Sequence, residues 1–504
     1  MQTITVRSAA LMGIDSTDVY VEVDISPGLP AFTIVGLGDT AVQESRDRIK
    51  AALKNSFDCI TRGKITVNLA PADLKKEGPS YDLAIALGIL HTQGFIHEEL
   101  QNNIFVGELS LDGSVRPSKG ILSIAAFAKN ANVEALFVSK ENAREAALIP
   151  GLTVYGASHI SDVVAHLNKK EQIVKEKHTF VSHKNDAHDA DFKHINGQEH
   201  VRRALEIAAS GGHNILLTGP PGSGKTLMAR SLPSIMPELT FDEALEVSRI
   251  HSVTGLLSRE QPLICERPFR SPHHSASGVS LVGGGAFPRP GEVSLAHRGI
   301  LFLDELPEFD RSVLENLRQP LEDGVIQISR ARQTLSFPAQ FSLVASMNPC
   351  PCGYLGSPEH DCRCAPTQVE RYQKKISGPL LDRIDLHVDV PRVDYDKLTV
   401  TQDNEASSSI RKRVEAARKV QKNRFKDTQV FTNSEMHSKH IKAFCALSSP
   451  SELLLQQAAK RLKLSARSYF RIIKVSRTIA DLSGVKDIGE DHIAEALQYR
   501  LDKE

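Results

Sequence analysis

Short apolar segments and helical patterns alternate along the first part of the chain. Strands are expected where apolar positions alternate or run together, and helices where they recur every three or four residues. The expected elements are strands over 19–25 and 64–68, a hairpin over 108–116 and helices over 81–90 and 121–129. The first of these helices is apolar almost all round, so it is expected to be buried. Together these elements predict an α+β domain.

A charged, histidine-rich stretch follows this domain. It contains few apolar side chains, so a solvated linker is expected, with a metal-binding histidine tract as the alternative. Beyond it, three short apolar segments are each followed by polar residues, and the last part of the chain is helical in pattern. The predicted domains are 1–166, a linker at 167–193, a core at 194–394 and a helical domain at 395–504.

Composition narrows the possible partners and location. The 504 residues carry no formal net charge, so nucleic-acid binding must come from local basic patches. The chain has no run of 18 apolar residues, and its first residues lack the layout of a signal peptide. A cytoplasmic location without membrane contact is therefore expected.

A glycine-rich loop lies between a predicted strand and a predicted helix. Its residues are Gly219, Pro220, Pro221, Gly222, Ser223, Gly224, Lys225 and Thr226, which match the pattern G-x-x-x-x-G-K-T. Glycines allow backbone N–H groups to turn towards phosphates, and the helix N-terminus adds its positive end. Lys225 is expected to reach the β- and γ-phosphates of ATP, and Thr226 to bind Mg²⁺. A chance match is the alternative, and the strand–loop–helix context argues against it.

Acidic and amide side chains follow the next two apolar segments. Asp304 and Glu305 come directly after 299–303, and Asn348 lies just beyond 341–345. Because ligands gather at the carboxyl ends of parallel strands, Asp304 is expected to hold Mg²⁺ through water. Glu305 is expected to orient and deprotonate the attacking water. Asn348 would position that water near the γ-phosphate, with a simple Asn-Pro turn as the alternative.

Four of the seven cysteines fall within fifteen positions. Cys350, Cys352, Cys362 and Cys364 form a C-x-C…C-x-C set, which suits a structural Zn²⁺ site made of thiolates. The spacing is tighter than the usual C-x₂-C, and His360 and Asp361 are close enough to act as substitute ligands. A disulfide pair and unliganded thiols are the alternatives.

The order of these motifs resembles an AAA+ ATPase of the helix-2-insert clade, near magnesium chelatase and the MCM helicases. Nearly the whole chain is similar to the YifB/ComM family of magnesium-chelatase-like proteins. The strings that carry the likeness are PFRSPHHS at 268–275, GEVSLAH at 291–297, SGPLLDRID at 377–385 and LSARSYFRII at 464–473. The resemblance implies an α/β fold with an AAA+ phosphate-loop core and a C-terminal helical lid. It also implies a preceding α+β domain like that of Lon protease, of the ribosomal S5 domain 2 type.

The resemblance assigns roles to arginines that spacing alone does not. Arg383 resembles the arginine finger presented to the ATP of a neighbouring subunit. Arg467 resembles the second sensor on the lid, with Arg471 one helical turn away as the alternative. A guanidinium in either place neutralises charge on the transferred phosphoryl group. A finger acting on a neighbour implies a ring, and the family likeness implies a homo-hexamer.

The first domain resembles the proteolytic domain of Lon without its expected base. Ser80 falls where that family has its nucleophile, which needs a lysine base within hydrogen-bond reach. Leu122 or Ile124 stands where that lysine is expected. Ser80 also fits as the N-cap of the next helix, with Asp82 in the first turn. We therefore expect a Lon-like fold that is not a protease.

A predicted hairpin over 326–337 brings two basic residues near its tip. It resembles the pre-sensor hairpin that lines the pore of MCM-like rings, where Arg330 and Arg332 would grip DNA phosphates. A second basic run covers 411–426, and a solvated face is the simpler interpretation of either. The family likeness favours a DNA helicase or branch-migration motor in natural transformation or recombination, with competence or recombination proteins as partners. The alternative is a protein-remodelling ATPase like the motor subunit of magnesium chelatase.

Overall fold

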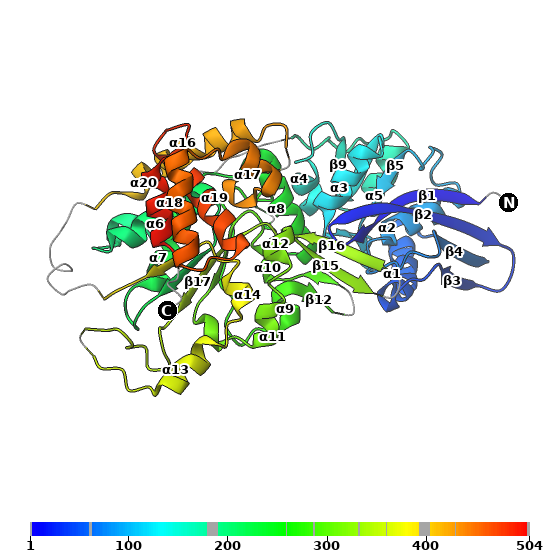
Figure 1. Ribbon diagram of the computed structural model, residues 1–504. Helices are drawn as coiled ribbons and strands as arrows, with labels where there is room; N and C mark the ends of the chain where they lie inside the picture. Colours follow the sequence, from blue (N-terminus) through cyan, green and yellow to red (C-terminus); the bar gives the residue numbers. More distant parts are fainter. Residues whose placement is uncertain are drawn as a thin grey trace. The chain divides into compact units, whose positions relative to one another are not determined.

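The computed structural model describes nine segments of the chain: residues 3–59, 63–178, 190–258, 260–285, 288–330, 333–358, 360–392, 404–428 and 430–500 (Figure 1). They form two compact units. Unit 1 contains the chain up to residue 183 and residues 241–264, and unit 2 contains residues 184–240 and 265–504. No helix among the described residues is both long and apolar enough to cross a membrane.

Unit 1 is built on a seven-stranded mixed sheet in the order β3-β4-β2-β1-β5-β8-β9. Its strands are β1 (Ile4–Met12), β2 (Asp15–Ser26), β3 (Ala31–Val35), β4 (Lys64–Ala70), β5 (Asn103–Phe105), β8 (Ala135–Ser139) and β9 (Val154–Ala157). Its helices are α1 (Thr40–Phe57), α2 (Asp82–Thr92), α3 (Ile121–Asn130), α4 (Lys140–Ala146), α5 (Ile160–Leu167) and α8 (Phe241–Thr254). The expected strands and helices are therefore confirmed. The predicted hairpin is also present, as β6 (Glu108–Leu109) paired with β7 (Val115–Arg116).

Helix α2 is buried along almost its whole length, as its all-round apolar pattern predicts. The start of this helix differs from the prediction. Tyr81 occupies the N-cap position and the cap has no side-chain hydrogen bond, so Ser80 is not the N-cap. Asp82 does lie in the first turn, but it is buried and pairs with the Arg48 guanidinium at 2.9 Å. A long-range ion pair thus replaces the local cap.

Unit 2 contains a five-stranded parallel sheet in the order β11-β14-β17-β10-β18. The strands are β11 (Phe269–Arg270), β14 (Ile300–Leu303), β17 (Ser342–Met347), β10 (Ile215–Thr218) and β18 (Leu386–Asp389). Helices and short turns of helix surround it: η1 (Phe192–His194), α6 (Glu199–Gly211), α7 (Lys225–Ser231), η2 (Leu232–Ile235), α9 (Gly278–Val282), α10 (Glu292–Leu295), η3 (Leu306–Glu308), α11 (Arg311–Glu315), α12 (Pro320–Asp323), α13 (Pro366–Gln373) and α14 (Gly378–Leu381). Because all five strands run in one direction, their carboxyl ends share one edge.

The C-terminal part of unit 2 is helical, as its pattern predicts. It contains α16 (Ser407–Arg424), η4 (Asn433–Glu435), α17 (Ser438–Phe444), α18 (Ser449–Arg461), α19 (Ala466–Leu482) and α20 (Glu490–Gln498). In Figure 1 these orange and red helices lie beside α6, and α6 and α19 pack against each other.

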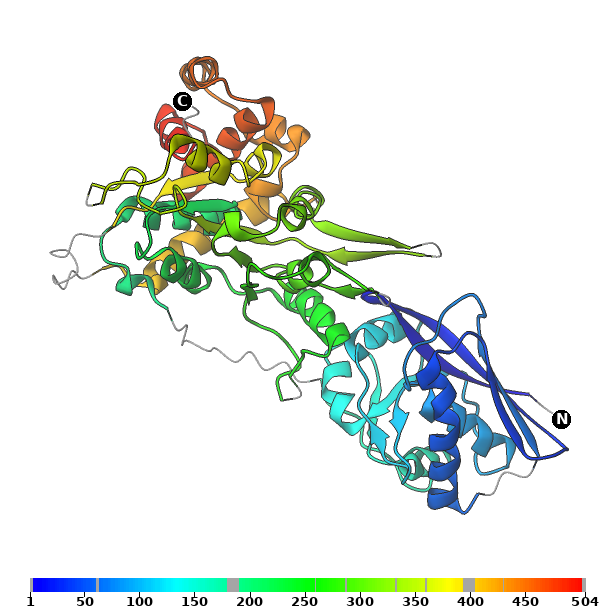
Figure 2. The same cartoon turned by 90° about the horizontal axis from the view of Figure 1, so that it is seen from below.

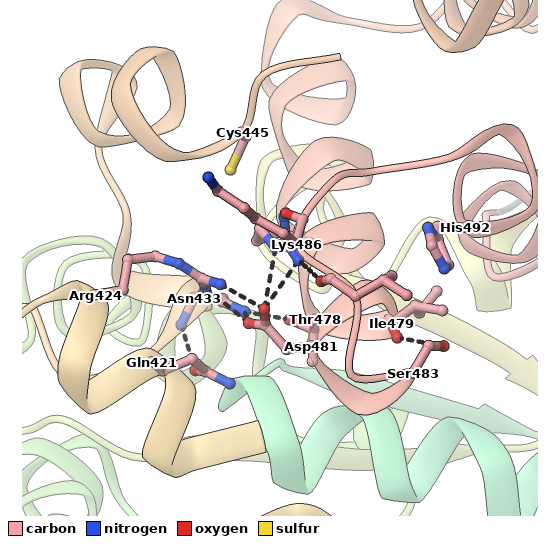
Figure 3. A network of polar contacts seen from close by, with 12 residues as sticks. Gln421, Arg424, Asn433, Cys445, Thr478, Ile479, Asp481, Ser483, Lys486 and His492 are labelled. Carbon is pink, nitrogen blue, oxygen red and sulfur yellow. Dashed lines mark hydrogen bonds and ion pairs between the residues drawn. The ribbon is translucent and has the colours of Figure 1, made fainter. Parts of the chain in front are cut away.

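A buried carboxylate ties these helices together. Figure 3 shows Arg424 and Asn433 turned towards Asp481 on α19. Arg424 donates to Asp481 at 2.7 Å, and Asn433 donates to the same oxygen at 2.8 Å. Arg477 adds a third donor at 3.1 Å. A buried charge of this kind is stable only when it is fully paired, so this cluster fixes α16, η4 and α19 relative to one another.

The chain departs from the predicted domain boundaries in two places. Helix α8 lies between two stretches of unit 2 along the chain, but it belongs to unit 1. There the Gly120 N–H donates to the Ser252 carbonyl at 3.0 Å. The predicted linker at 167–193 also includes residues at both ends that pack into the two units. The Glu176 N–H donates to Val154 in unit 1, and Phe192 is fully buried in the core of unit 2.

Candidate ATP site

The phosphate loop joins β10 to α7 at the carboxyl edge of the parallel sheet. Strand β10 lies between the central strand β17 and the edge strand β18, so the loop leaves the sheet one strand in from its end. Gly222 and Gly224 have φ of +76° and +88°, which glycine adopts without strain. A Cβ at Gly219 would lie 2.2 Å from the Val390 carbonyl oxygen. Three glycines of the pattern are therefore required by the backbone.

Lys225 is the buried centre of this loop. Its ammonium donates to the carbonyl oxygens of Gly219 at 2.7 Å and Pro220 at 2.8 Å. Burial lowers the pKa of Lys225, and the carboxylates of Asp304 and Glu305 oppose that shift. The ammonium and both predicted acids therefore share one electrostatic environment.

Thr226 and Asp304 converge on one point beside the loop. The Thr226 hydroxyl donates to Asp304 Oδ2 at 2.8 Å. The other carboxylate oxygen of Asp304 accepts from the Ser346 hydroxyl and from the Glu305 backbone N–H. Hydroxyl and carboxylate oxygens are ligands that Mg²⁺ prefers. The side chains present therefore fit a Mg²⁺ ion held by Thr226 and Asp304.

Glu305 follows Asp304 at the carboxyl end of β14. Its backbone φ is +52°, an uncommon value for a residue with a side chain. Its backbone N–H lies 3.3 Å from the Ser346 hydroxyl oxygen, and its side chain is 58% exposed. Such a constrained backbone presents the carboxylate at the edge of the sheet, where the predicted general base must stand.

Asn348 follows β17 and reaches the phosphate loop. The Asn348 Oδ1 lies 3.4 Å from the Lys225 Nζ. The neighbouring Met347 carbonyl accepts from the Gly219 N–H at 3.1 Å, which fixes the end of β17 against the start of the loop. The structure thus brings Asn348 to the loop, and its action on a water molecule stays a prediction.

The four clustered cysteines gather into one sulfur group. The sulfurs of Cys350, Cys352, Cys362 and Cys364 lie within 4.8 Å of one another, and all seven cysteines of the chain are free. Three sulfur pairs are separated by 3.4, 3.6 and 3.6 Å. Thiolates bound tetrahedrally to Zn²⁺ at about 2.3 Å would stand about 3.8 Å apart. The spacing fits a four-sulfur metal site, whereas a disulfide requires about 2.05 Å.

The surroundings of the sulfurs favour a thiolate at Cys352 in particular. Backbone N–H groups of Tyr354 and Arg363 lower the pKa of Cys352 to about 6, whereas desolvation and the neighbouring thiols raise the pKa of Cys362 and of Cys364. His360, a predicted substitute ligand, instead packs its ring against Tyr354 with centroids 5.0 Å apart. Asp361 is likewise outside the sulfur group. The four cysteines themselves therefore form the candidate metal site.

The cysteine-rich loop forms part of the wall of the ATP site. A Cβ at Gly353 would lie 2.5 Å from the Pro221 side chain, so the two loops are in direct contact. From α13, the Gln373 amide donates to the Pro349 carbonyl at 3.2 Å. The segment that begins at Asn348 is therefore held between the phosphate loop and α13.

Arg383 and Arg467 meet at a carboxylate that the sequence did not indicate. Both guanidinium groups pair with Glu322 at α12, the Arg467 contact measuring 3.0 Å. Arg383 also donates to the Pro379 carbonyl at 2.7 Å, and its side chain is 7% exposed. Arg467 is 55% exposed. Two arginines with separate predicted roles thus share the Glu322 carboxylate as a partner. No sequence motif indicates Glu322.

Arg471 lies elsewhere, in a buried junction. It donates to Asp385 at 2.5 Å, and the second oxygen of Asp385 lies 3.2 Å from His213 Nδ1. Burial would raise the pKa of Asp385, but Arg471 and His213 outweigh it and hold that pKa below its usual range. Both lid-sensor candidates are thus paired with carboxylates, Arg471 at 18% exposure and Arg467 at 55%, and the choice between them stays a prediction.

The predicted DNA hairpin is present as β15 (Val325–Arg330) and β16 (Gln333–Pro338). In Figure 2 it projects from the body of unit 2. Arg330 ends β15, and Arg332 lies outside the described residues. Most basic residues of the second run are exposed on α16, as a solvated face predicts, and two of its arginines also contact α6. Arg413 pairs with Glu206 at 2.6 Å, and the Arg418 guanidinium donates to the Ala209 carbonyl.

At the two positions where the Lon resemblance expects a lysine base, the structure places apolar side chains. Leu122 and Ile124 on α3 are buried, as expected for core positions. Lys119 lies against Gly255 at the end of α8, where a Cβ would stand 2.8 Å from the lysine Cε. Burial raises the pKa of the neighbouring Tyr81 phenol, and the Ser80 hydroxyl opposes that shift.

Comparisons with known proteins match the chain almost from end to end. The family described as magnesium chelatase, subunit ChlI, matches residues 191–398, and its C-terminal part matches 404–500. A third match, subunit ChlI of Mg-chelatase, covers residues 21–142.

Full-length relatives are considerably more similar than the chelatase subunits. Competence protein ComM of Haemophilus influenzae is 45% identical, covering 99% of this chain and 98% of its own. YifB of Escherichia coli is 43% identical, with 99% and 97% covered. The 67 kDa magnesium-chelatase subunit of Heliobacterium mobile is 26% identical over 32% of this chain and 28% of its own. The chain therefore belongs to the YifB/ComM family of magnesium-chelatase-like AAA+ proteins.

Proposed function

We propose that the chain is a Mg²⁺-dependent ATPase that assembles as a homo-hexameric ring and moves DNA. The observation that carries the proposal is the convergence of Lys225, Thr226 and Asp304 at the carboxyl edge of the parallel sheet. There an ammonium, a hydroxyl and a carboxylate are arranged as ATP phosphates and Mg²⁺ require. The bound Mg²⁺ would neutralise charge that develops on the phosphates.

Hydrolysis in this site depends on groups from two subunits. Glu305 takes the proton of the attacking water, and Asn348 orients that water towards the γ-phosphate. Arg383 supplies positive charge to the ATP of the neighbouring subunit, and Arg467 acts as the second sensor on the lid. Both arginines would leave their common partner Glu322 to do so. Each ATP would then lie at a subunit boundary, which couples hydrolysis to movement around the ring.

DNA is the cargo that the protein supports best. The β15–β16 hairpin projects from unit 2, with Arg330 as the last residue of β15. Arg330 and Arg332 would grip the DNA backbone, as the sequence predicts. Phosphate contacts from such residues carry no sequence preference, which suits a translocating motor. The relative from Haemophilus influenzae is named for competence, which supports helicase or branch-migration action during integration of transforming DNA. This work belongs in the cytoplasm, with competence or recombination proteins as partners.

Two further parts of the proposal concern accessory features. The four cysteines of the 350–364 loop hold a structural Zn²⁺ ion, which their sulfur spacing supports. Unit 1 has a Lon-like fold that is not a protease, because Leu122 or Ile124 stands where the lysine base is expected. A Ser-directed covalent probe that labelled Ser80 would contradict this second part.

The alternative is a protein-remodelling ATPase like the magnesium-chelatase motor, which the matches to subunit ChlI favour. ATPase rates with and without forked DNA distinguish the two. A DNA motor is expected to show stimulation by forked DNA that falls steeply with salt. Double substitution of Arg330 and Arg332 by alanine should reduce that stimulation, whereas the surface variant Arg46→Ala should not. Insensitivity to every DNA, together with stimulation by a partner protein, would contradict the motor.

A further inference from the structure

His274 lies beside the proposed general base without a role in the chemistry described above. It belongs to the PFRSPHHS string, on the loop that follows β11. Strand β11 pairs in parallel with β14, with Arg270 opposite Leu301. The loop after β11 therefore leaves the sheet at the same carboxyl edge as Glu305, which follows β14.

This loop is anchored at its base and along its length. Arg270, the last residue of β11, makes a two-pronged ion pair with Glu292 at 2.6 and 2.8 Å. Such paired contacts fix orientation as well as distance. Beyond it, the His273 ring lies 2.8 Å from the Ser275 hydroxyl, and the Ala276 N–H donates to the His273 carbonyl. The backbone that carries His274 is therefore held in one turn.

The His274 ring is packed on two sides. It stacks on His273 with ring centroids 4.0 Å apart, and it meets Phe309 edge-on at 6.4 Å. This packing directs its Nδ1 to within 3.9 Å of the Glu305 Oε2. The Glu305 backbone is fixed in turn by its N–H contacts to Asp304 and Ser346. Both partners thus start from constrained positions.

We propose that His274 is a positioning residue that holds the Glu305 carboxylate towards the attacking water. This inference rests on the proposed ATPase function. An exposed ion pair between two long, free side chains contributes little because ordering them is costly. Here the imidazole is already ordered by ring packing, so it can restrict the carboxylate at little entropic cost. The string that contains His274 is thereby connected to the hydrolytic step.

The role of His274 is separate from the bond changes themselves. Glu305 accepts the proton as the water oxygen forms a bond to the γ-phosphorus. The bond between that phosphorus and the β–γ bridging oxygen breaks, and ADP leaves with the electron pair. His274 affects only where the carboxylate stands when this occurs. Its loss should therefore slow turnover without weakening ATP binding.

Steady-state ATPase kinetics of the full chain test this assignment. His274→Ala should lower kcat by about 10- to 100-fold, the cost of a misplaced catalytic group, and leave KM within about twofold. His274→Gln, which keeps a neutral N–H donor, should recover part of the loss. His97→Ala, which replaces an exposed histidine of unit 1, is the matched control and should behave as wild type. A fluorescent ATP analogue should bind all three variants equally.

A kcat of His274→Ala within twofold of wild type would overturn the proposal. So would a loss in kcat accompanied by an equal loss in ATP-analogue affinity, because that pattern indicates general damage to the site. If His274→Ala does not fold, His274→Leu, which also lacks an N–H donor, decides by the same criteria. Lys225→Ala serves as the reference for the ATPase itself. If that variant hydrolyses ATP normally, the proposed function fails, and if it alone is inactive, only the His274 assignment fails.

Discussion

Glu305 shows how much of the site depends on single residues held in constrained positions. Its φ of +52° and the exposure of its side chain suit a base that must meet a water molecule. The strand-end acid pair made this residue predictable, because apolar segments that end in acids mark the binding edge of a parallel sheet. The same reasoning does not find Glu322, which lies on α12 with no motif around it and acts through contacts distant in sequence.

Replacing Glu305 should separate ATP binding from hydrolysis. In Glu305→Gln the amide cannot accept the proton of the attacking water, so kcat should fall by about 10²- to 10⁴-fold. Lys225, Thr226 and Asp304 remain, so affinity for an ATP analogue should stay near that of wild type. Glu308→Gln, three residues later on η3, is the control and should retain activity. Normal turnover by Glu305→Gln would remove this residue from the site.

Ser80 shows where local reasoning goes wrong. A serine before an apolar helix is a common N-cap, but the tertiary environment moves the cap to Tyr81 and pairs Asp82 with Arg48. For the lid arginines, sequence likeness left Arg467 and Arg471 as alternatives. The two differ in exposure, since Arg471 is mostly buried against Asp385 and Arg467 is half-exposed beside Glu322, and the choice stays a prediction. Both surroundings depend on partners that are remote in the chain.

At the scale of elements, the buried carboxylate of Asp385 joins β18 to α19, and its contribution to stability can be tested. Asp385 stands at the start of β18 and pairs with Arg471 of α19 and with His213 at the end of α6. The strands β10, β14 and β17 were predictable from apolar segments followed by polar residues. Strand β18 was not predicted, although its residues alternate between apolar and polar as a strand pattern does.

Asp385→Asn should destabilise the protein by about 3–5 kcal/mol near neutral pH, because Arg471 would lose its buried partner. The Asp385 pKa is lower in the folded protein than in the unfolded chain. Its stabilising contribution is therefore complete above the unfolded value of about 3.9 and is lost as pH falls towards the folded pKa. Denaturant unfolding across pH should show the gap between wild type and Asp385→Asn shrinking below about pH 4.

Asp382→Asn, a partly exposed residue three positions earlier, is the control for that series. It should cost far less stability at every pH. A gap between wild type and Asp385→Asn that stayed constant down to pH 2 would show that the carboxylate charge is not what holds the junction.

The cysteine-rich loop makes a second element-scale prediction. Wild-type protein should carry about one zinc per chain by elemental mass spectrometry, as a four-thiolate site requires. Cys352→Ser should lose most of it, whereas Cys59→Ser, which changes a cysteine outside the sulfur group, should keep it. Metal-free wild type prepared without chelator would refute the site. Because Gly353 contacts Pro221, metal loss is also expected to weaken ATP binding.

At the scale of the whole molecule, each unit is made of two separate stretches of the chain, whereas the sequence predicts one continuous domain after another. The apolar residues of α8, Ala244, Val247 and Ile250, are buried in a unit that begins more than two hundred residues earlier. A helical pattern predicts that such a face is buried but not against which partner. The sequence pattern therefore predicted the candidate site and most elements, but not that α8 belongs to unit 1.

A shared site between subunits should be visible when two inactive variants are mixed. Arg383→Ala should bind ATP but not hydrolyse it, and Lys225→Ala should bind ATP poorly. In mixed rings, an intact phosphate loop from the first variant can meet an intact Arg383 from the second. ATPase activity should therefore reappear on mixing. Activity of Arg383→Ala alone at the wild-type rate, or no recovery in rings shown to be mixed, would place Arg383 outside a shared site.

The central claim is that ATP hydrolysis at Lys225 drives movement of DNA. A branch-migration assay on a labelled four-way or three-stranded junction measures this directly, with wild type compared with Lys225→Ala. The account predicts strand exchange by wild type only when ATP and Mg²⁺ are present, and none above background by Lys225→Ala. Equal activity of the two proteins, or an active ATPase that leaves every junction unmoved, would contradict it.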